Sequence, residues 1–244
     1  MQNPALPPGL SPVRAIIFDT FGSVVDWRGS LIAELTAWAA GRGIAADWAA
    51  LVDEWRAAYQ PSMQKVRTGA QPWTVLDDLH RASLDRLVAE FGITGLSDAD
   101  LDWINRGWHR LRPWPDAVGG LARLKTKFIV GPLSNGNTAL LVNMAKEAGL
   151  PWDMIFASDV TRAYKPDPET YLGAAALLRL EPGQVMMAAA HNGDLAAARA
   201  CGLKTAFWPR PGEYGPRQVR DFAADGPWDV VATDIADLAT RMGC

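Results

Sequence analysis

The feature that most constrains the fold of this chain is a series of short apolar runs that alternate with helix-like stretches. Residues 13–19, VRAIIFD, form the first run, a segment rich in β-branched residues that ends in an acidic residue. Such alternation predicts an α/β fold with a Rossmann-like parallel sheet and right-handed crossovers. The further strand-like runs are residues 127–134, 153–158, 185–190, 204–208 and 229–232, and the helix-like stretches between them include 137–148, 168–178 and 194–201.

A long helical segment interrupts this alternation after the first run. Residues 26–125 separate the first two runs, which is far more chain than one crossover needs. We therefore expect a helical cap domain, residues 26–114, inserted into a Rossmann-like core domain made of residues 1–25 and 115–244. Eight of the 11 tryptophans fall within the cap, at positions 27, 38, 48, 55, 73, 103, 108 and 114. The expected cap helices are residues 31–40, 45–59, 73–91 and 97–111, the last with Ser97 and Asp100 at its start.

Composition narrows the class of protein. Of the 244 residues, 49% are hydrophobic, which is enough for a sizeable core and excludes a disordered or fibrous chain. The 24 basic residues against 27 acidic ones give a net charge of −3, so we expect no nucleic-acid partner and no anionic membrane partner. Two cysteines and three scattered histidines form neither a disulfide framework nor a zinc motif. With no apolar run of signal-peptide or membrane-span length, these features predict a cytoplasmic protein.

Polar residues follow several of the predicted strands. In an open parallel sheet, ligands bind beyond the carboxyl ends of the strands. Asp19 follows the first strand, Ser134 and Asn135 follow the second, Lys165 lies after the third, and residues 191–194 follow the fourth. A carboxylate beside a lysine stays ionised at neutral pH and can attack carbon or phosphorus. Asp19 is therefore a candidate nucleophile.

Four segments in this order resemble the haloacid dehalogenase superfamily, and the similarity extends over nearly the whole chain. The cap is placed as in members that carry it after the first strand. The segments are FDTFGSVVD at 18–26, LSNG at 133–136, YKPDPETY at 164–171 and NGDLAAARACG at 192–202. The resemblance implies nucleophilic catalysis by the aspartate of the first segment, Asp19.

Two positions distinguish between branches of that superfamily. Phosphatases in it carry a second aspartate two residues after the nucleophile and commonly a metal-binding aspartate four residues before the last conserved one. Here these positions hold Phe21 and Ala190. The (S)-2-haloacid dehalogenase branch instead has an aromatic residue at the first of these positions and needs no metal. The chain resembles that branch, so we expect no metal and no other cofactor.

The resemblance assigns roles at the reacting carboxylate. Asp19 matches the nucleophile, and Ser23 matches the hydroxyl residue that orients it. Lys165 matches the lysine that pairs with the nucleophile. Asp194 matches the acid that holds this lysine and helps place the hydrolytic water.

The resemblance also assigns substrate contacts. Ser134 and the backbone N–H of Thr20 match groups that bind the substrate carboxylate. Arg56, in the predicted cap, matches the arginine that receives the departing halide. Further expected substrate contacts or pocket walls are Phe21, Trp73, Asn135, Tyr171, His191 and Asn192.

His191 is a departure from the pattern of this branch. Many members read Ser-Ser-Asn-x-x-Asp in the last motif, whereas this chain reads AAHNGD at residues 189–194. His191 therefore stands where an asparagine is usual. It is either a substitute polar contact for the nucleophile or the water, or a structural histidine.

The implied activity is that of a hydrolase acting on carbon–halide bonds. Its substrates would be short (S)-2-haloacids or haloacetates, which would give 2-hydroxy acids and halide through a covalent aspartyl intermediate. The branch also implies a homodimer through cap and core helices. Two alternatives stay open at this point: a metal-dependent phosphatase of the same superfamily, and a non-catalytic binding protein that keeps the fold.

Overall fold

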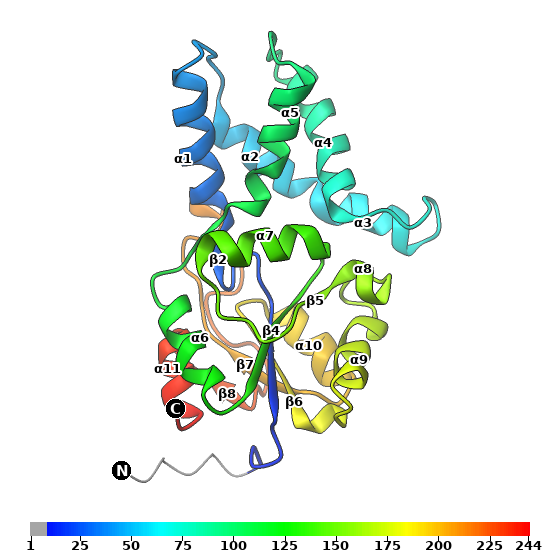
Figure 1. Ribbon diagram of the computed structural model, residues 1–244, viewed down its shortest axis with the longest axis vertical. Helices are drawn as coiled ribbons and strands as arrows, with labels where there is room; N and C mark the ends of the chain where they lie inside the picture. The colour runs from blue at the N-terminus through cyan, green and yellow to red at the C-terminus, as the bar shows by residue number, and fades with distance from the viewer. Residues whose placement is uncertain (1–8) are drawn as a thin grey trace.

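A six-stranded parallel sheet organises the chain (Figure 1). The computed structural model describes residues 9–244. The strands lie in the order β5-β4-β1-β6-β7-β8, and every neighbouring pair is parallel. Each strand falls within one of the predicted runs, so the predicted α/β fold is confirmed. The strands are β1 Ala15–Phe18, β4 Ile129–Ser134, β5 Phe156–Ala157, β6 Val185–Ala189, β7 Lys204–Phe207 and β8 Val230–Val231.

Helices cover both faces of this sheet, which explains why β1 is apolar at every position. Ile16 and Phe18 belong to one buried cluster, and Ala15 and Ile17 belong to another on the opposite face. All four side chains are fully buried. The first cluster includes residues of α6 Ala117–Lys125, α7 Thr138–Ala148 and α11 Ile235–Arg241, and the second includes residues of α9 Pro168–Leu177 and α10 Asn192–Ala200.

A helical insert, defined here as residues 27–109, lies beyond the carboxyl ends of the strands (Figure 1). Just outside the insert, β2 Val25–Asp26 and β3 Arg112–Pro113 form an antiparallel pair. This pair brings the two ends of the insert together. The proposed division into core and cap domains stays a prediction, and residues 1–8 of that core lie outside the described residues. The insert comprises α1 Trp27–Ala40, α2 Trp48–Ala57, α3 Tyr59–Arg67, α4 Leu76–Glu90, α5 Asp98–Asn105 and the 3₁₀ helix η1 Arg106–His109.

Two of the expected insert helices differ from those observed. The helix predicted over residues 45–59 ends at Ala57, and α3 starts at Tyr59. Pro61 has no N–H to continue the α2 hydrogen-bond ladder, so one continuous helix is disfavoured here. The helix predicted over 97–111 begins with the expected capping box of Ser97 and Asp100, but it gives way to η1 after Asn105.

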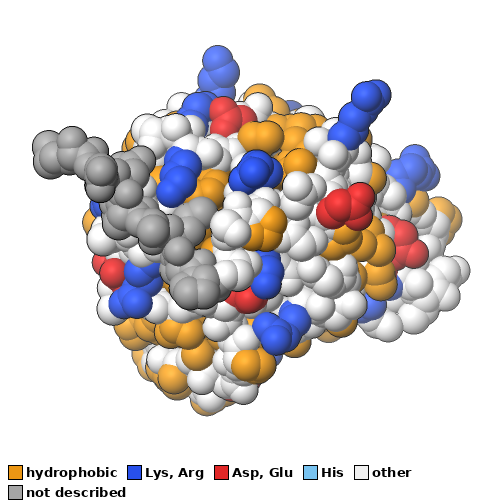
Figure 2. All heavy atoms as spheres, turned by 90° about the horizontal axis from the view of Figure 1, so that it is seen from below, with side chains coloured by type: hydrophobic (Ala, Val, Ile, Leu, Met, Phe, Trp, Pro, Cys, Tyr) orange, Lys and Arg blue, Asp and Glu red, His pale blue; other side chains and the backbone are white. Residues whose placement is uncertain are grey.

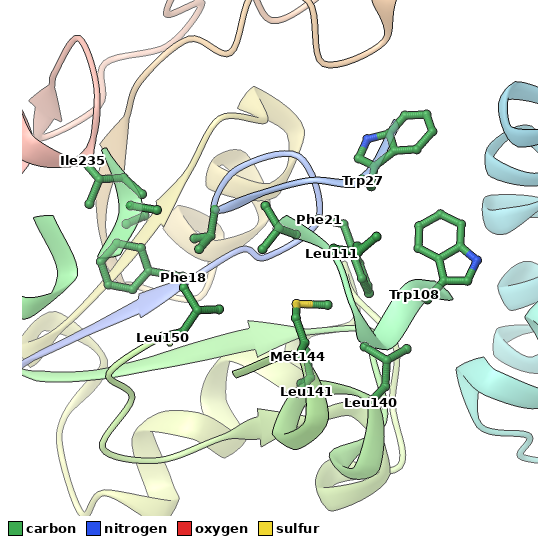
Figure 3. Close-up of a cluster of buried hydrophobic side chains, with 14 of the residues drawn as sticks. Phe18, Phe21, Trp27, Trp108, Leu111, Leu140, Leu141, Met144, Leu150 and Ile235 are labelled. Carbon is green, nitrogen blue, oxygen red and sulfur yellow. The ribbon is translucent and has the colours of Figure 1, made fainter. Parts of the chain in front are cut away.

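Buried apolar side chains join the insert to the sheet. Figure 3 shows this cluster running from Phe18 on β1, past Phe21 and Leu111, to Trp27 and Trp108 in the insert. Trp27 and Trp108 stack with ring centroids 6.2 Å apart. The insert therefore shares a continuous hydrophobic core with the strands that carry the polar residues described below.

The face of the molecule opposite the insert has a mixed surface. Figure 2 shows basic, acidic and hydrophobic side chains interspersed over its visible part. Small and scattered patches of this kind are usual for a protein surface. Among residues 9–244, no helix is both long enough and apolar enough to span a membrane.

Candidate active site

A cavity of about 860 Å³ is lined by residues from the strand ends and the insert. Its walls include Asp19, directly after β1, and Asn135, directly after β4. Parallel strands bring these residues to one edge of the sheet, as the sequence predicted. The other predicted site residues among its walls are Phe21, Arg56, Lys165, Tyr171, His191, Asn192 and Asp194.

Asp19 is buried in the wall of this cavity, and both of its carboxylate oxygens accept hydrogen bonds. Lys165 Nζ donates to Oδ1 at 2.8 Å. Ser23 Oγ donates to Oδ2 at 2.6 Å, and His191 Nδ1 lies 2.9 Å from the same oxygen. The backbone N–H of Ala190 in turn donates to Ser23 Oγ at 2.9 Å, which directs the Ser23 proton to Asp19. The carboxylate is thus held in one orientation.

Lys165 joins Asp19 to a second buried carboxylate. Its ammonium group also donates to Asp194 Oδ2, and Tyr171 OH donates to Asp194 Oδ1 at 2.6 Å. The backbone N–H of Lys165 donates to Asn135 Oδ1 at 2.7 Å, which fixes the loop that carries the lysine. A buried ammonium group held between two carboxylates forms strong, charge-assisted hydrogen bonds.

Glu213 is a site residue that the sequence reasoning missed. Its Oε2 lies 2.8 Å from His191 Nε2, and its Oε1 accepts from Trp27 Nε1 at 3.1 Å. Glu213 is 1% exposed. His191, whose role the sequence left open, therefore bridges two carboxylates and directly contacts Asp19.

The charges of this cluster set its protonation. Burial raises the pKa of Asp19, but the Lys165 and His191 charges outweigh it and hold the pKa far below its usual value. Burial lowers the pKa of Lys165, yet Asp19 and Asp194 hold it above its usual value. Burial raises the pKa of Asp194, in opposition to Lys165. Asp19 is therefore an ionised and poorly hydrated carboxylate, which is the form that acts as a nucleophile.

Arg56 brings a third cation to the cavity from α2. Its guanidinium lies 4.3 Å from the ring centroid of Tyr59 and 5.3 Å from that of Trp27. Within residues 9–244, its buried Nη1 has no hydrogen-bond partner and the side chain forms no ion pair. A buried cation with an unused donor in an aromatic pocket is suited to bind an anion.

Four predicted site residues do not line the cavity. Ser23 lies behind Asp19, and Ser134 Oγ accepts from the Gly136 N–H at 3.2 Å. Thr20 is fully buried, and its backbone oxygen accepts from Val24 and Val25.

Trp73, expected as a pocket wall, instead packs against Tyr164, with ring centroids 4.9 Å apart. Its aromatic face is used by that contact rather than by the cavity. Asn192 does line the cavity, but its side-chain amide donates to Asp221 and the Ala223 carbonyl and accepts from Trp228. These contacts tie down the loop that follows β7.

The fold and the site define a class: an α/β protein with a buried, ionised aspartate at a strand end and a helical insert above it. A family model for haloacid dehalogenase-like hydrolases matches residues 13–202. The chain belongs to this family of hydrolases.

Relatives and solved structures agree with that assignment. The crystal structure of an L-2-haloacid dehalogenase is 52% identical, with a TM-score of 0.92, and covers 94% of this chain and 98% of that one. The structure of a defluorinating L-2-haloacid dehalogenase is also 52% identical, with a TM-score of 0.94, covering 99% of this chain and 100% of that one. The (S)-2-haloacid dehalogenase 4A of Burkholderia cepacia is 26% identical over 238 residues, 93% of this chain and 98% of that protein.

Proposed function

We propose that this chain is a hydrolytic dehalogenase of short (S)-2-haloacids or haloacetates, and that it forms a covalent ester on Asp19. The observation that carries the proposal is a buried, ionised Asp19 in the same cavity as an Arg56 guanidinium with an unused donor. One group can displace a halide, and the other can receive it. The similarity to proteins named as 2-haloacid dehalogenases supports the same substrate class.

In the first step, an Asp19 oxygen attacks the α-carbon of the substrate in line with the carbon–halogen bond. The bond to the halogen breaks with its electron pair, and the halide moves to Arg56. Arg56 interacts most strongly with charge that develops as the bond breaks, so it lowers the transition state more than the ground state. In-line attack inverts the configuration at the α-carbon. The 2-hydroxy acid forms when water hydrolyses the ester.

We assign the substrate carboxylate to the end of β4. Asn135 lines the cavity there, and Ser134 precedes it. The backbone N–H of Thr20 forms no hydrogen bond to any residue in the range 9–244, so it is a further candidate donor. Ser134 and Thr20 are not among the cavity walls, so their contacts with the substrate anion remain predictions.

The helical insert would act as the cap of this site. Phe21, Trp27 and Tyr59 line the cavity beside the charged groups. Apolar walls limit the hydration of Asp19 and so increase its reactivity. The cap domain of residues 26–114, the homodimer and the cytoplasmic location remain predictions.

The residues do not fit the magnesium site of a phosphatase. Lys165 Nζ donates to both Asp19 and Asp194, so a cation between these carboxylates would have to displace the ammonium group. Within residues 9–244, no group of three or more His, Cys, Asp or Glu side chains is arranged to hold a metal ion. Magnesium requires several oxygen ligands, and the phosphatase alternative is therefore disfavoured.

Halide release tests the proposal. The protein is incubated with chloroacetate or (S)-2-chloropropionate in the presence of EDTA, and free chloride is measured. We expect chloride and the 2-hydroxy acid in equal amounts. A folded sample that releases no halide from a broad panel of 2-haloacids, or that requires magnesium, would contradict it.

A further inference from the structure

We propose that His191, held as an imidazolium by Glu213, stabilises with Ser23 the oxyanion that forms on Asp19 Oδ2 during hydrolysis of the ester. This inference deepens the proposed function and rests on it. It assigns a catalytic role to His191, which occupies a position where related enzymes usually have asparagine. It assigns a positioning role to Glu213.

The hydrogen bonds of Asp19 distinguish its two oxygens. Oδ2 accepts from Ser23 and from His191, and two donors occupy the lone-pair directions of a carboxylate oxygen. Oδ1 accepts only from Lys165 among the described residues. Oδ1 thus keeps a lone pair for attack on the substrate. After the attack, Oδ1 is the ester oxygen and Oδ2 is the carbonyl oxygen, already bonded to Ser23 and His191.

The position of His191 between two carboxylates favours a ring that carries both of its protons. Nδ1 faces Asp19 Oδ2 at 2.9 Å, and Nε2 faces Glu213 Oε2 at 2.8 Å. An ionised carboxylate only accepts hydrogen bonds, so each ring nitrogen donates when both carboxylates are ionised. Burial lowers the pKa of His191, but Glu213 and Asp19 raise it well above its usual value. Of the other charged groups nearby, Lys165 contacts Asp19 and Asp194 rather than the ring, and the Arg56 guanidinium interacts electrostatically with Glu213.

Glu213 is fixed from several sides. Trp27 Nε1 in the insert donates to Oε1, which leaves Oε2 for His191. The backbone of Gly22 also passes close to this carboxylate, because a Cβ on Gly22 would lie 2.0 Å from Glu213 Oε1. Gly22 has a φ of +85°, so glycine is favoured there for both reasons. Gly22, three residues after Asp19, therefore makes room for the Glu213 carboxylate that stabilises the imidazolium form of His191.

The hydrolysis step can then be written with its atoms and electrons balanced. Water adds to Asp19 Cγ, one water proton passes to the Asp194 carboxylate, and the carbonyl π electrons move to Oδ2. Ser23 and His191 stabilise this oxyanion by their hydrogen bonds. On collapse, the Cγ–Oδ1 bond breaks, the departing alkoxide takes the proton from Asp194, and the Asp19 acid that forms loses its own proton to solvent water. His191 keeps both of its protons throughout.

The first test separates ester formation from ester hydrolysis. His191→Ala and His191→Leu, which remove the ring donor, are mixed with chloroacetate under single-turnover conditions, and intact mass follows the carboxymethyl ester. Losing one oxyanion donor costs about 100-fold to 1000-fold. We expect hydrolysis to slow by about 100-fold, while ester formation changes by less than about 10-fold, so that the ester accumulates. His109→Gln is the matched control, since His109 pairs with Asp77 at 3.0 Å and does not line the cavity.

The second test addresses Glu213 and includes a readout that does not need turnover. In wild type, NMR of the ring nitrogens should show His191 doubly protonated at pH 8. In Glu213→Gln it should lose a proton below pH 8, and the rate of ester hydrolysis should fall as the pH rises through that lower pKa. Circular dichroism verifies that each variant is folded. If Glu213→Gln does not fold, the His191 variants still test the proposal.

The outcomes distinguish this inference from the proposed function. If wild type releases no halide from any 2-haloacid, the proposed function fails. In a second outcome, wild type is active, but ester formation limits the turnover of the His191 variants and no ester accumulates. The oxyanion role is then wrong. A neutral His191 in wild type at pH 8 would contradict the role of Glu213.

Discussion

The strand ends and the helical insert differ in how many of their buried polar atoms lack a hydrogen-bond partner among residues 9–244: the strand ends have fewer, among them Thr20 Oγ1, and the insert has more. Around Asp19, the carboxylates, Lys165 and His191 are bonded to one another. In the insert, Arg56 Nη1, both ring nitrogens of His80 and Trp108 Nε1 are buried without a partner among residues 9–244. Paired groups fix a geometry, whereas an unpaired donor remains able to bind a ligand. The strand ends thus orient the Asp19 carboxylate, and the insert supplies the Arg56 cation within an aromatic wall.

Replacement of the nucleophile should have the largest effect. Asp19→Asn removes the carboxylate that is proposed to attack the substrate and that Lys165 and His191 contact. We therefore expect dehalogenase activity to fall by about 10⁴-fold or more. Chloride release from chloroacetate measures it. Asp85→Asn on the exposed side of α4 is the control and should retain wild-type activity. Substantial activity in folded Asp19→Asn would show that another group attacks the substrate.

Loss of the unpaired cation should separate activity from stability. For Arg56→Met we expect kcat to fall about 10²-fold to 10³-fold, because the departing halide loses its partner. The free energy of unfolding should fall by no more than about 1 kcal/mol, because no ion pair is broken and burying the cation was itself costly. Kinetics and urea unfolding measure the two effects, with the exposed Arg86→Met as control. If kcat stays within about threefold of wild type, Arg56 does not receive the halide.

His80 tests the cost of an unpaired group in the insert. Burial is the main cause that lowers the pKa of His80 to about 3, from a usual 6.5. The unfolded chain therefore binds a proton between these pH values that the folded one does not, and stability falls as the pH drops through this window. From pH 7 to pH 5 this loss amounts to about 2 kcal/mol.

His80→Phe keeps a ring against Trp108, which lies 4.3 Å away between centroids, and removes the titrating group. We expect the variant to lose about 2 kcal/mol less stability than wild type between pH 7 and pH 5, measured by urea unfolding. Equal losses in both proteins would mean that His80 takes up its proton over the same pH range in the folded and the unfolded states.

The ion pair between Arg67 and Asp167 should have the smallest effect. It joins α3 to the loop before α9 at 2.6 Å, and both side chains are partly exposed. We expect Arg67→Ala to lower the free energy of unfolding by less than about 1 kcal/mol, and the difference from wild type to shrink at high salt. Arg86→Ala, which breaks a pair within α4, is the control. A fall in the free energy of unfolding above about 2 kcal/mol would show that this ion pair stabilises the contact between the insert and the rest of the protein more than an exposed pair usually does.

The strand ends were far more predictable from sequence than the insert. Asp19 and Asn135 follow apolar runs, and parallel strands bring the ends of such runs to one edge. No comparable rule predicts from the sequence which way a side chain of the insert points. Trp73 therefore could not be assigned to the cavity or to Tyr164 from its position in the chain.

Glu213 could not be predicted for a different reason. It lies in the Pro- and Gly-rich segment PRPGEYGPR, residues 209–217, which has no strand or helix periodicity. A carboxylate in such a loop is normally exposed to solvent. The unusual histidine at position 191 was the available signal, because a buried imidazole beside one carboxylate gains from a second partner on its other nitrogen.

Oxygen isotope transfer tests the central claim most directly. A single turnover of chloroacetate by excess protein in H₂¹⁸O is followed by mass spectrometry of the peptide that contains Asp19 and of the product. If an Asp19 ester is hydrolysed at Cγ, one ¹⁸O appears in the Asp19 carboxylate, and the glycolate formed is unlabelled. Labelled glycolate with an unlabelled Asp19 would show that water attacks the substrate directly, and would contradict the account.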